Sequence, residues 1–130
     1  MRLEMLAEAG EIRRARQAVG AWATQIGMPP AIVADLVLAT HEALANAVDH
    51  AYPAAAGAVS VTAECTGADV LVVVRDHGSW RPPQPVNGRG RGLLLIRHLA
   101  DHVDLSHDNN GTTVRMTWSG VLEPQANGSL

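Results

Sequence analysis

The sequence has one cysteine, no lysine and no long hydrophobic run, and each of these features excludes a class of protein. Because Cys65 is the only cysteine, the chain cannot form an internal disulfide or a metal site with several cysteine ligands. The 10 basic residues are all arginines, and 13 acidic residues give a net charge of −3. We find no basic stripe with interleaved aromatic residues, so the electrostatic footprint of a nucleic-acid-binding protein is missing.

The longest apolar runs are "VLVVV" at 70–74 and "GLLLI" at 92–96, and both are far shorter than a bilayer span. The first residues show no signal-peptide pattern, so we expect a cytoplasmic protein without a membrane partner. Hydrophobic residues make up 47% and charged residues 18%, as in ordinary globular domains. The length of 130 residues predicts one domain, which we place at 1–118, followed by a loose tail at 119–130.

The order of the expected elements favours an α+β fold. The predicted helices are 11–26, 30–51 and 93–103, and the predicted strands are 58–65, 69–75, 103–108 and 112–118. The first six residues form either a short edge strand or a frayed start. Since the strands pair locally and the helices gather on one face, we predict a two-layer α/β sandwich with a mixed, mostly antiparallel sheet.

The second predicted helix carries a polar stripe on an otherwise apolar surface. Asp35, Glu42, Asn46 and Asp49 follow one another at intervals of seven, four and three positions, which places them on one face. A helix that is apolar over most of its circumference is packed on several sides, so this stripe must face a cavity or solvent. For Glu42 and Asn46 taken alone, a solvated face is the simpler interpretation.

Three further patterns can bring polar or flexible groups to a ligand. Asp76 and Gly78 follow an apolar strand, and strand ends hold polar groups rigidly. The glycines of "GRGRG" at 88–92 precede a helix, where backbone N–H groups can approach a phosphate. Thr112 and Thr113 follow an Asn-Asn-Gly turn. Each pattern also has a purely structural explanation: an Asp-x-Gly turn, a loop, or high β-propensity.

Taken together and in chain order, the four patterns resemble the GHKL ATP-binding domain that histidine kinases, gyrase and MutL share. That family has Glu-x-x-x-Asn on a helix, Asp-x-Gly after a strand, a glycine box opening a helix, and Gly-Thr near the last strands. The corresponding segments here are "EALAN" at 42–46, "DHG" at 76–78, "GRGLLLIRHLAD" at 90–101 and "NGTTV" at 110–114. Within the superfamily, "HEALANAVDHAYP" and the compact size look most similar to anti-sigma-factor serine kinases of the RsbW and SpoIIAB type.

The resemblance implies a Bergerat-type ATP-binding fold and a role for each matching residue. Glu42 would be the general base for a serine hydroxyl, and Asn46 would bind Mg²⁺. Asp76 would accept a hydrogen bond from the adenine amino group, and Gly78 would leave room for the ring. The phosphate-binding loop would comprise Gly90, Arg91, Gly92 and Leu93, and Thr112 or Thr113 would close the adenine pocket.

The same resemblance implies an activity and partners. Members of this branch bind a sigma factor as a homodimer and use ATP to phosphorylate a serine on a STAS-domain anti-anti-sigma factor. Two other functions stay open: a partner-switching module that binds nucleotide without transferring phosphate, and the catalytic domain of a histidine kinase. The few residues before Glu11 leave no room for the helical hairpin that carries a phosphoacceptor histidine, which favours the serine kinase.

Trp80 occupies a position where the family commonly has a second glycine. Since tryptophan does not adopt positive φ cheaply and three prolines follow it, we expect a stiff lid, measurable ATP binding and slow phosphotransfer. Trp80→Gly should accelerate transfer and abolish most of the nucleotide-linked change in tryptophan fluorescence, to which Trp22 and Trp118 should contribute little. An unchanged rate together with an unchanged fluorescence response would contradict the stiff lid.

Overall fold

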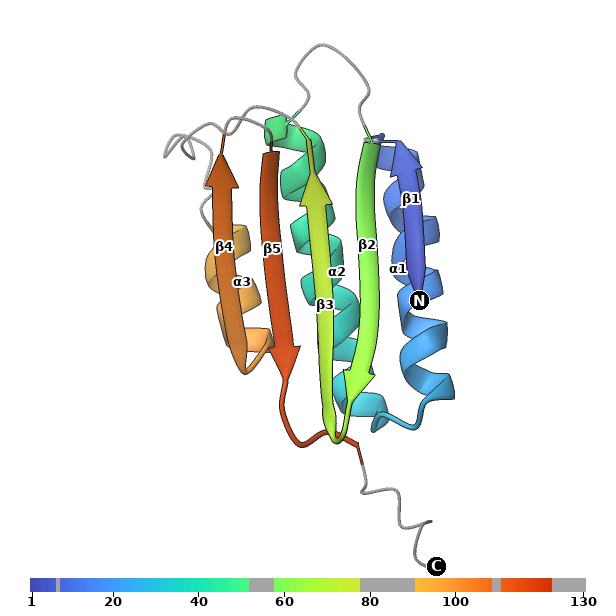
Figure 1. Ribbon diagram of the computed structural model, residues 1–130. Helices are drawn as coiled ribbons and strands as arrows, with labels where there is room; N and C mark the ends of the chain where they lie inside the picture. The colour runs from blue at the N-terminus through green and yellow to red at the C-terminus, as the bar shows by residue number, and fades with distance from the viewer. Residues whose placement is uncertain (7, 52–57, 78–90, 109–110, 123–130) are drawn as a thin grey trace, which may run out of the picture.

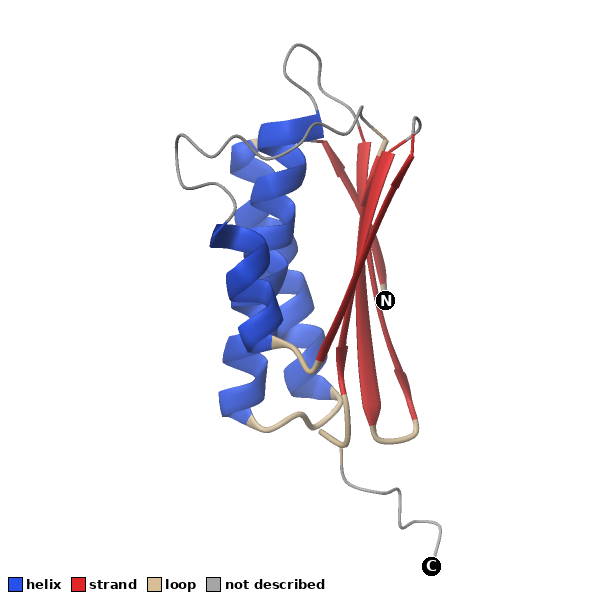
Figure 2. Cartoon of the chain, turned by 90° about the vertical axis from the view of Figure 1, so that its left-hand side faces the viewer, coloured by secondary structure: helices blue, strands red, loops and turns tan. Residues whose placement is uncertain are grey.

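The computed structural model describes residues 1–6, 8–51, 58–77, 91–108 and 111–122, without the side chains of 49–51, 91–92 and 108. Its elements, in chain order, are β1 (Arg2–Leu6), α1 (Ala9–Gln25), α2 (Pro30–Ala51), β2 (Ala58–Thr66), β3 (Asp69–Asp76), α3 (Arg91–Leu99), β4 (His102–Asp108) and β5 (Gly111–Trp118). The five strands form one sheet in the order β1-β2-β3-β5-β4, and each neighbouring pair is antiparallel (Figure 1). The three helices cover one face, which confirms the predicted two-layer α+β sandwich (Figure 2). The described sheet is antiparallel throughout, and the expectation of a mixed sheet was wrong in that respect.

The sheet separates an apolar face from a polar one by strict alternation along its strands. In β3, Val70, Val72 and Val74 are buried beneath the helices. Their partners across the ladder in β5 are Trp118, Met116 and Val114, which are also buried. Since successive side chains point to opposite faces, the residues between them lie on the uncovered face. This alternation fixes the register, because a slip of one residue would expose the whole apolar set.

The longest helix, α2, lies between α1 and α3 against the sheet (Figure 1). Its buried positions are Leu36, Ala39, Thr40, Ala43, Leu44 and Ala47. Among the described helices, only the segment Pro30–Val48 of α2 has the length and composition of a membrane span. A single helix of this kind does not establish a membrane span, because the core helix of a soluble protein meets the same criterion. In this structure α2 packs against α1, α3 and the sheet.

Two of the predicted boundaries were wrong at the junction of α3 and β4. The helix ends at Leu99 instead of 103, and the strand begins at His102. The apolar spacing continues through Val103, but Val103 pairs with Met116 of β5, so strand pairing determines its conformation. The Leu99 carbonyl accepts a hydrogen bond from Nε1 of buried Trp118 at 2.9 Å, which ties the last turn of α3 to β5.

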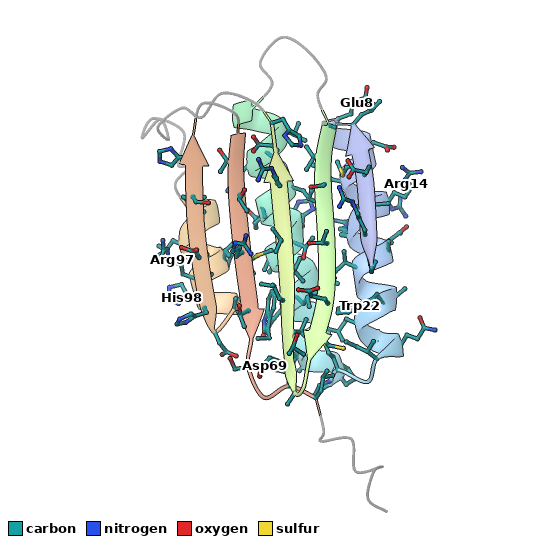
Figure 3. The ribbon with its side chains drawn as sticks, viewed as in Figure 1. Glu8, Arg14, Trp22, Asp69, Arg97 and His98 are labelled. Carbon is teal, nitrogen blue, oxygen red and sulfur yellow. The ribbon has the colours of Figure 1, made fainter. Side chains whose placement is uncertain are left out.

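The chain continues in contact with the domain beyond Trp118. The backbone N–H of Ser119 donates to Oδ2 of Asp101 at 2.7 Å, and that of Gly120 donates to Oδ1 of Asp69 at 2.8 Å. Asp69 lies at the turn between β2 and β3, at the lower end of the sheet in Figure 3. A tail at 119–130 stays a prediction, since 123–130 fall outside the described residues.

The N-terminal segment forms the edge strand β1, which settles the choice between a strand and a frayed start. The N-terminal ammonium group of Met1 donates to the Ala63 carbonyl at 2.9 Å, and the Ala63 N–H donates back to the Met1 carbonyl at 2.9 Å. Met5 is buried, while Leu6 on the opposite face is half exposed at 51%. β1 therefore extends the sheet from β2 and buries one side chain beside α1.

Candidate functional site

Three of the expected ATP-binding patterns lie, as far as the structure describes them, at one edge of the molecule. β3 ends at Asp76, β5 begins at Gly111, and α2 reaches its C-terminal end at the same level (Figure 1). We call this region the site edge and define it by Asp76, Gly111, Thr112 and the α2 segment 42–48. Since β3 and β5 are antiparallel neighbours, the end of one strand must lie beside the start of the other.

Gly111 lies close against the backbone of Asp76 at the site edge. Gly111 has φ +148, in the positive range that side chains rarely adopt. A Cβ atom built on Gly111 would overlap the carbonyl oxygen of Asp76, and the Cα of His77 would lie only 2.9 Å from it. Because these neighbours are backbone atoms, no change of rotamer could relieve the overlap. Glycine is therefore required for β5 to begin at this point.

Asp76 is buried at 6% exposure, although it carries a carboxylate. Its Oδ1 atom accepts a hydrogen bond from the backbone N–H of Thr112 at 3.2 Å. A buried carboxylate is stable only when hydrogen bonds replace the water it has lost. The adjacent strand supplies one of these bonds, and it fixes the orientation of the carboxylate. A carboxylate fixed in this way is a well-oriented acceptor for an N–H donor such as an amino group.

The two predicted threonines lie on opposite faces of the sheet. Thr113 faces Arg75 across one ladder and Ser106 across the other, and these positions belong to the uncovered face. Thr112 precedes it and therefore lies on the helix-covered face, next to Asp76. Of the two, Thr112 has the placement that fits a role beside Asp76.

The polar stripe of α2 has the expected half-buried character. Asp35, Glu42 and Asn46 are each partly exposed, while Ala43 and Ala47 beside them are buried. Glu42 and Asn46 are separated by one turn, so their side chains project in similar directions. Asp49 belongs to the same helix, but its side chain lies outside the described residues. The stripe thus lies at a border of the packed core, where a polar group stays accessible.

The predicted phosphate-binding loop is described only at its junction with α3. Gly78 and Gly90 lie outside the described residues, whereas Arg91 and Gly92 form the first turn of α3. Leu93 is half-buried and packs against the hydrophobic core. Since α3 begins at Arg91, its first backbone N–H groups have no partner within the helix itself. Arg97 and His98 project from the later turns of α3 (Figure 3).

Within the described part of the chain, no group of three or more histidine, cysteine or acidic side chains could hold a metal ion. A magnesium ion held by Asn46 would not produce such a group. Mg²⁺ typically takes one or two ligands from the protein and completes its shell with water and phosphate oxygens. The amide oxygen of half-buried Asn46 fits that requirement, because it is a hard oxygen ligand on a rigid helix.

The sequence patterns did not predict the contacts of four polar or small residues in and around α2. Thr40 is fully buried and donates from Oγ1 to the Leu36 carbonyl at 2.8 Å, which satisfies its hydroxyl within the helix. Arg16 of α1 contacts His41 of α2, with Nη1 at 3.1 Å from Nδ1. Gly20 of α1 lies against Val37 of α2. The sequence does contain a pattern that could predict this contact between α1 and α2. Residues 16 and 20 on one helix, and 37 and 41 on the other, are each spaced by one turn.

A family model for the histidine kinase-like ATPase domain matches residues 5–118. The chain belongs to this family. The match spans every described helix and nearly all of the sheet, and it confirms the GHKL resemblance of the RsbW and SpoIIAB type that the four patterns indicated. Membership of this ATPase family implies that the domain binds ATP.

Two curated relatives are named anti-sigma F factors, from Thermoanaerobacter sp. strain X514 and Thermoanaerobacter pseudethanolicus strain ATCC 33223 / 39E. Each is 27% identical over 130 residues, covering 90% of this chain and 91% of the relative. Among solved structures, the RsbU and RsbW domains of Rv1364c from Mycobacterium tuberculosis match with a TM-score of 0.73 and 27% identity over 91% of this chain. The chain spans only 32% of that longer protein.

A third similarity concerns the fold alone. The histidine kinase domain of the blue-light activated histidine kinase EL346 from Erythrobacter litoralis has a TM-score of 0.60 at 18% identity. It covers 86% of this chain and 60% of that protein. Histidine kinases and this ATPase-family domain therefore share the same architecture of helices on an open sheet.

Gly111→Ala should weaken ATP binding by roughly tenfold or more, which corresponds to ~1.4 kcal/mol. The added Cβ would push Thr112 away from Asp76 and misalign the buried carboxylate. The measurement is titration with a non-hydrolysable ATP analogue by calorimetry, on protein shown to be folded by circular dichroism. Gly67→Ala is the matched control, because Gly67 also has positive φ (+61) but has open space around its Cβ position. Equal losses in both variants would mean that backbone strain, and not the contact with Asp76, causes the effect.

Proposed function

We propose that the chain is an ATP-dependent serine-protein kinase that also acts as an anti-sigma factor. It would bind a sigma factor and transfer phosphate from ATP to a serine of a STAS-domain anti-anti-sigma factor. The observation that carries this proposal is the buried Asp76 carboxylate, held by Thr112 at the edge where the Glu42–Asn46 turn of α2 also lies. The similarity to anti-sigma F factors and to an RsbW domain supports the choice of partners.

Asp76 and Gly78 would recognise the base of the nucleotide. The oriented carboxylate of Asp76 accepts hydrogen bonds, so it suits the amino group of adenine and disfavours a carbonyl oxygen at that position. Burial makes this discrimination stronger, because a mismatched acceptor would leave two oxygens facing each other away from water. Gly78 would leave space for the ring, as the family pattern implies.

Glu42 would serve as the general base. It would take the proton from the acceptor serine hydroxyl as the oxygen attacks the γ-phosphorus and the bond to the β,γ-bridging oxygen breaks. Phosphoryl transfer asks the protein mainly for positioning and charge stabilisation. A carboxylate on a helix, partly exposed at the border of the core, can meet both the hydroxyl and the solvent that finally receives the proton.

Asn46 would hold Mg²⁺ through its amide oxygen, one turn beyond Glu42. When bound, the ion supplies positive charge to the phosphate oxygens. Gly90, Arg91, Gly92 and Leu93 would form the phosphate-binding segment at the start of α3. In that segment the backbone N–H groups would donate to phosphate and the Arg91 guanidinium would add charge. Leu93 packs against the core and so anchors the helix. Thr112 would complete the site beside Asp76, and Thr113 stays a weaker prediction.

Partner binding would occur as a homodimer in the cytoplasm, without direct contact to nucleic acid or membrane. The net charge of −3 and the missing basic stripe favour a protein partner over DNA.

A partner-switching module without phosphotransfer is the second candidate, favoured by Trp80 and the prolines after it. Incubation with labelled ATP and candidate STAS proteins distinguishes the outcomes. Acid-stable phosphoserine supports the proposal, acid-labile phosphohistidine indicates a histidine kinase, and no label with intact partner binding indicates the switching module.

Glu42→Gln should slow phosphorylation by roughly 10²–10⁴-fold while ATP affinity stays within a few fold, since the amide keeps the size but cannot accept the proton. The measurement is single-turnover transfer to the STAS substrate at saturating ATP. Glu64→Gln, an exposed substitution of the same type on β2, is the control and should match the parent. Equal turnover by Glu42→Gln and parent would exclude Glu42 as the base.

Asn46→Ala and Asp76→Asn should lose nucleotide binding in different ways. Asn46→Ala should weaken binding only when Mg²⁺ is present, because its role is to hold the ion on the phosphates. Asp76→Asn should weaken adenine nucleotides with or without Mg²⁺, because its role concerns the base. Calorimetric titration of ADP with Mg²⁺ or with EDTA measures both effects. The same pattern of loss in both variants would contradict the two assignments.

A further inference from the structure

The contact between α1 and α2 includes one hydrogen bond between side chains. Nη1 of Arg16 lies 3.1 Å from Nδ1 of His41, in a partly buried position. Among the hydrogen bonds described between side chains, this is the one that joins two helices, since the others join residues two or three positions apart. His41 directly precedes Glu42, the proposed base.

The two helices approach each other closely one turn away from this hydrogen bond, and that approach makes the bond possible. A Cβ atom on Gly20 would lie 2.9 Å from Cγ2 of Val37, so α1 and α2 approach closely there. Gly20 and Arg16 are separated by one turn of α1, and Val37 and His41 by one turn of α2. The two contacts therefore follow one another along one antiparallel interface between α1 and α2. We call this interface the seam, and it runs alongside the segment that carries Glu42.

The chemistry of the pair fixes its donor and acceptor. Every guanidinium nitrogen of arginine carries hydrogen and none can accept, so Arg16 donates and Nδ1 of His41 accepts. The proton of the neutral imidazole must then lie on Nε2. Since both groups are partly buried, removing either partner leaves the other with a polar atom that water can solvate only in part, so the loss destabilises this contact.

We infer that the Arg16–His41 hydrogen bond positions Glu42 for proton transfer, an inference that rests on the proposed kinase function. His41 and Glu42 are consecutive, so their side chains leave α2 about 100° apart. Fixing the His41 ring against α1 fixes the rotation of this turn of α2, and with it the direction in which Glu42 projects. Arg16 and His41 are positioning residues and do not touch the substrate.

Small displacements matter at this point because a general base must lie within hydrogen-bond reach of the hydroxyl. A shift of about 1 Å in a reacting group can cost roughly 10²-fold in rate. The ATP-binding contacts at Asp76 lie on the sheet and not on this turn of α2. Loss of the hydrogen bond should therefore lower kcat and leave ATP affinity nearly unchanged.

The test compares His41→Leu with His41→Asn. The amide oxygen of asparagine lies close to the position of Nδ1 and can accept from Arg16, whereas leucine cannot. His41→Leu should lower kcat for phosphotransfer by roughly tenfold with the Kd for ATP within about twofold, and His41→Asn should restore most of kcat. Arg16→Met should reproduce the loss, and the Arg16→Met/His41→Leu double variant should be no slower than either single variant.

Arg14→Met is the matched control on the same helix. Arg14 lies beside α1 at the outer edge of the molecule (Figure 3), is largely exposed and pairs with Glu11 at 2.8 Å, so its removal takes away one positive charge without affecting the seam. Its kcat should equal that of the parent. Thermal unfolding of each variant separates positioning from stability, because a kcat loss that only follows the unfolded fraction would overturn the inference.

A ¹⁵N-detected spectrum of the histidine ring gives a readout that needs no activity. The parent should show His41 as the Nε2–H tautomer, and Arg16→Met should change the Nδ1 shift. A parent that transfers no phosphate to serine refutes the proposed function and this inference with it. A parent that transfers phosphate, combined with a His41→Leu variant of unchanged kcat, refutes only the positioning role.

Discussion

The burial of α2 is the constraint on which the rest of the structure depends. This helix of 22 residues is apolar over most of its surface, and no single neighbour could cover it. The sheet covers one side, while α1 and α3 flank it on the same layer (Figure 2). Each buried leucine side chain contributes about 1.5–3 kcal/mol relative to exposure, so covering Leu36 and Leu44 strongly favours this three-helix arrangement. What remains uncovered is a narrow polar stripe, and that stripe carries Glu42 and Asn46.

A second consequence concerns how polar groups are tolerated near this core. Each of the two buried polar residues among the described ones has a specific hydrogen bond: Thr40 within its own helix, and Asp76 from the backbone of the neighbouring strand. The hydroxyl of Thr40 is thereby satisfied within the helix and has a structural role. Asp76 is held at the edge where two antiparallel strands meet, and Gly111 allows those strands to approach. The same geometry that stabilises the carboxylate also orients it as an acceptor for a ligand.

The two ends of the sheet, the site edge and the end opposite to it, have different roles. At the end far from the site edge, the indole N–H of Trp118 donates a hydrogen bond to the last turn of α3. The carboxylates of Asp101 and Asp69 accept hydrogen bonds from the backbone N–H groups of Ser119 and Gly120, respectively. These bonds fix the helix–strand connection and the β2–β3 turn against each other. The site edge is therefore supported by strands and helices whose opposite ends are fixed, which is how a rigid scaffold keeps functional groups in place.

From residue 11 onward the sequence alone determined the element types, and it determined the two-layer architecture and the family, because apolar periodicity and four spaced motifs are local properties of the chain. Pairing with β2 decided that the first residues form a strand. It predicted Glu42, Asn46, Asp76 and Thr112 for the same reason. Tertiary structure decided what depends on partners distant in sequence. Pairing with Met116 ended α3 before Val103, strand alternation placed Thr113 on the uncovered face, and the close approach of β5 to Asp76 required glycine at 111. The seam that joins Arg16 to His41 likewise exists only because α1 and α2 pack antiparallel, bringing together residues 25 positions apart.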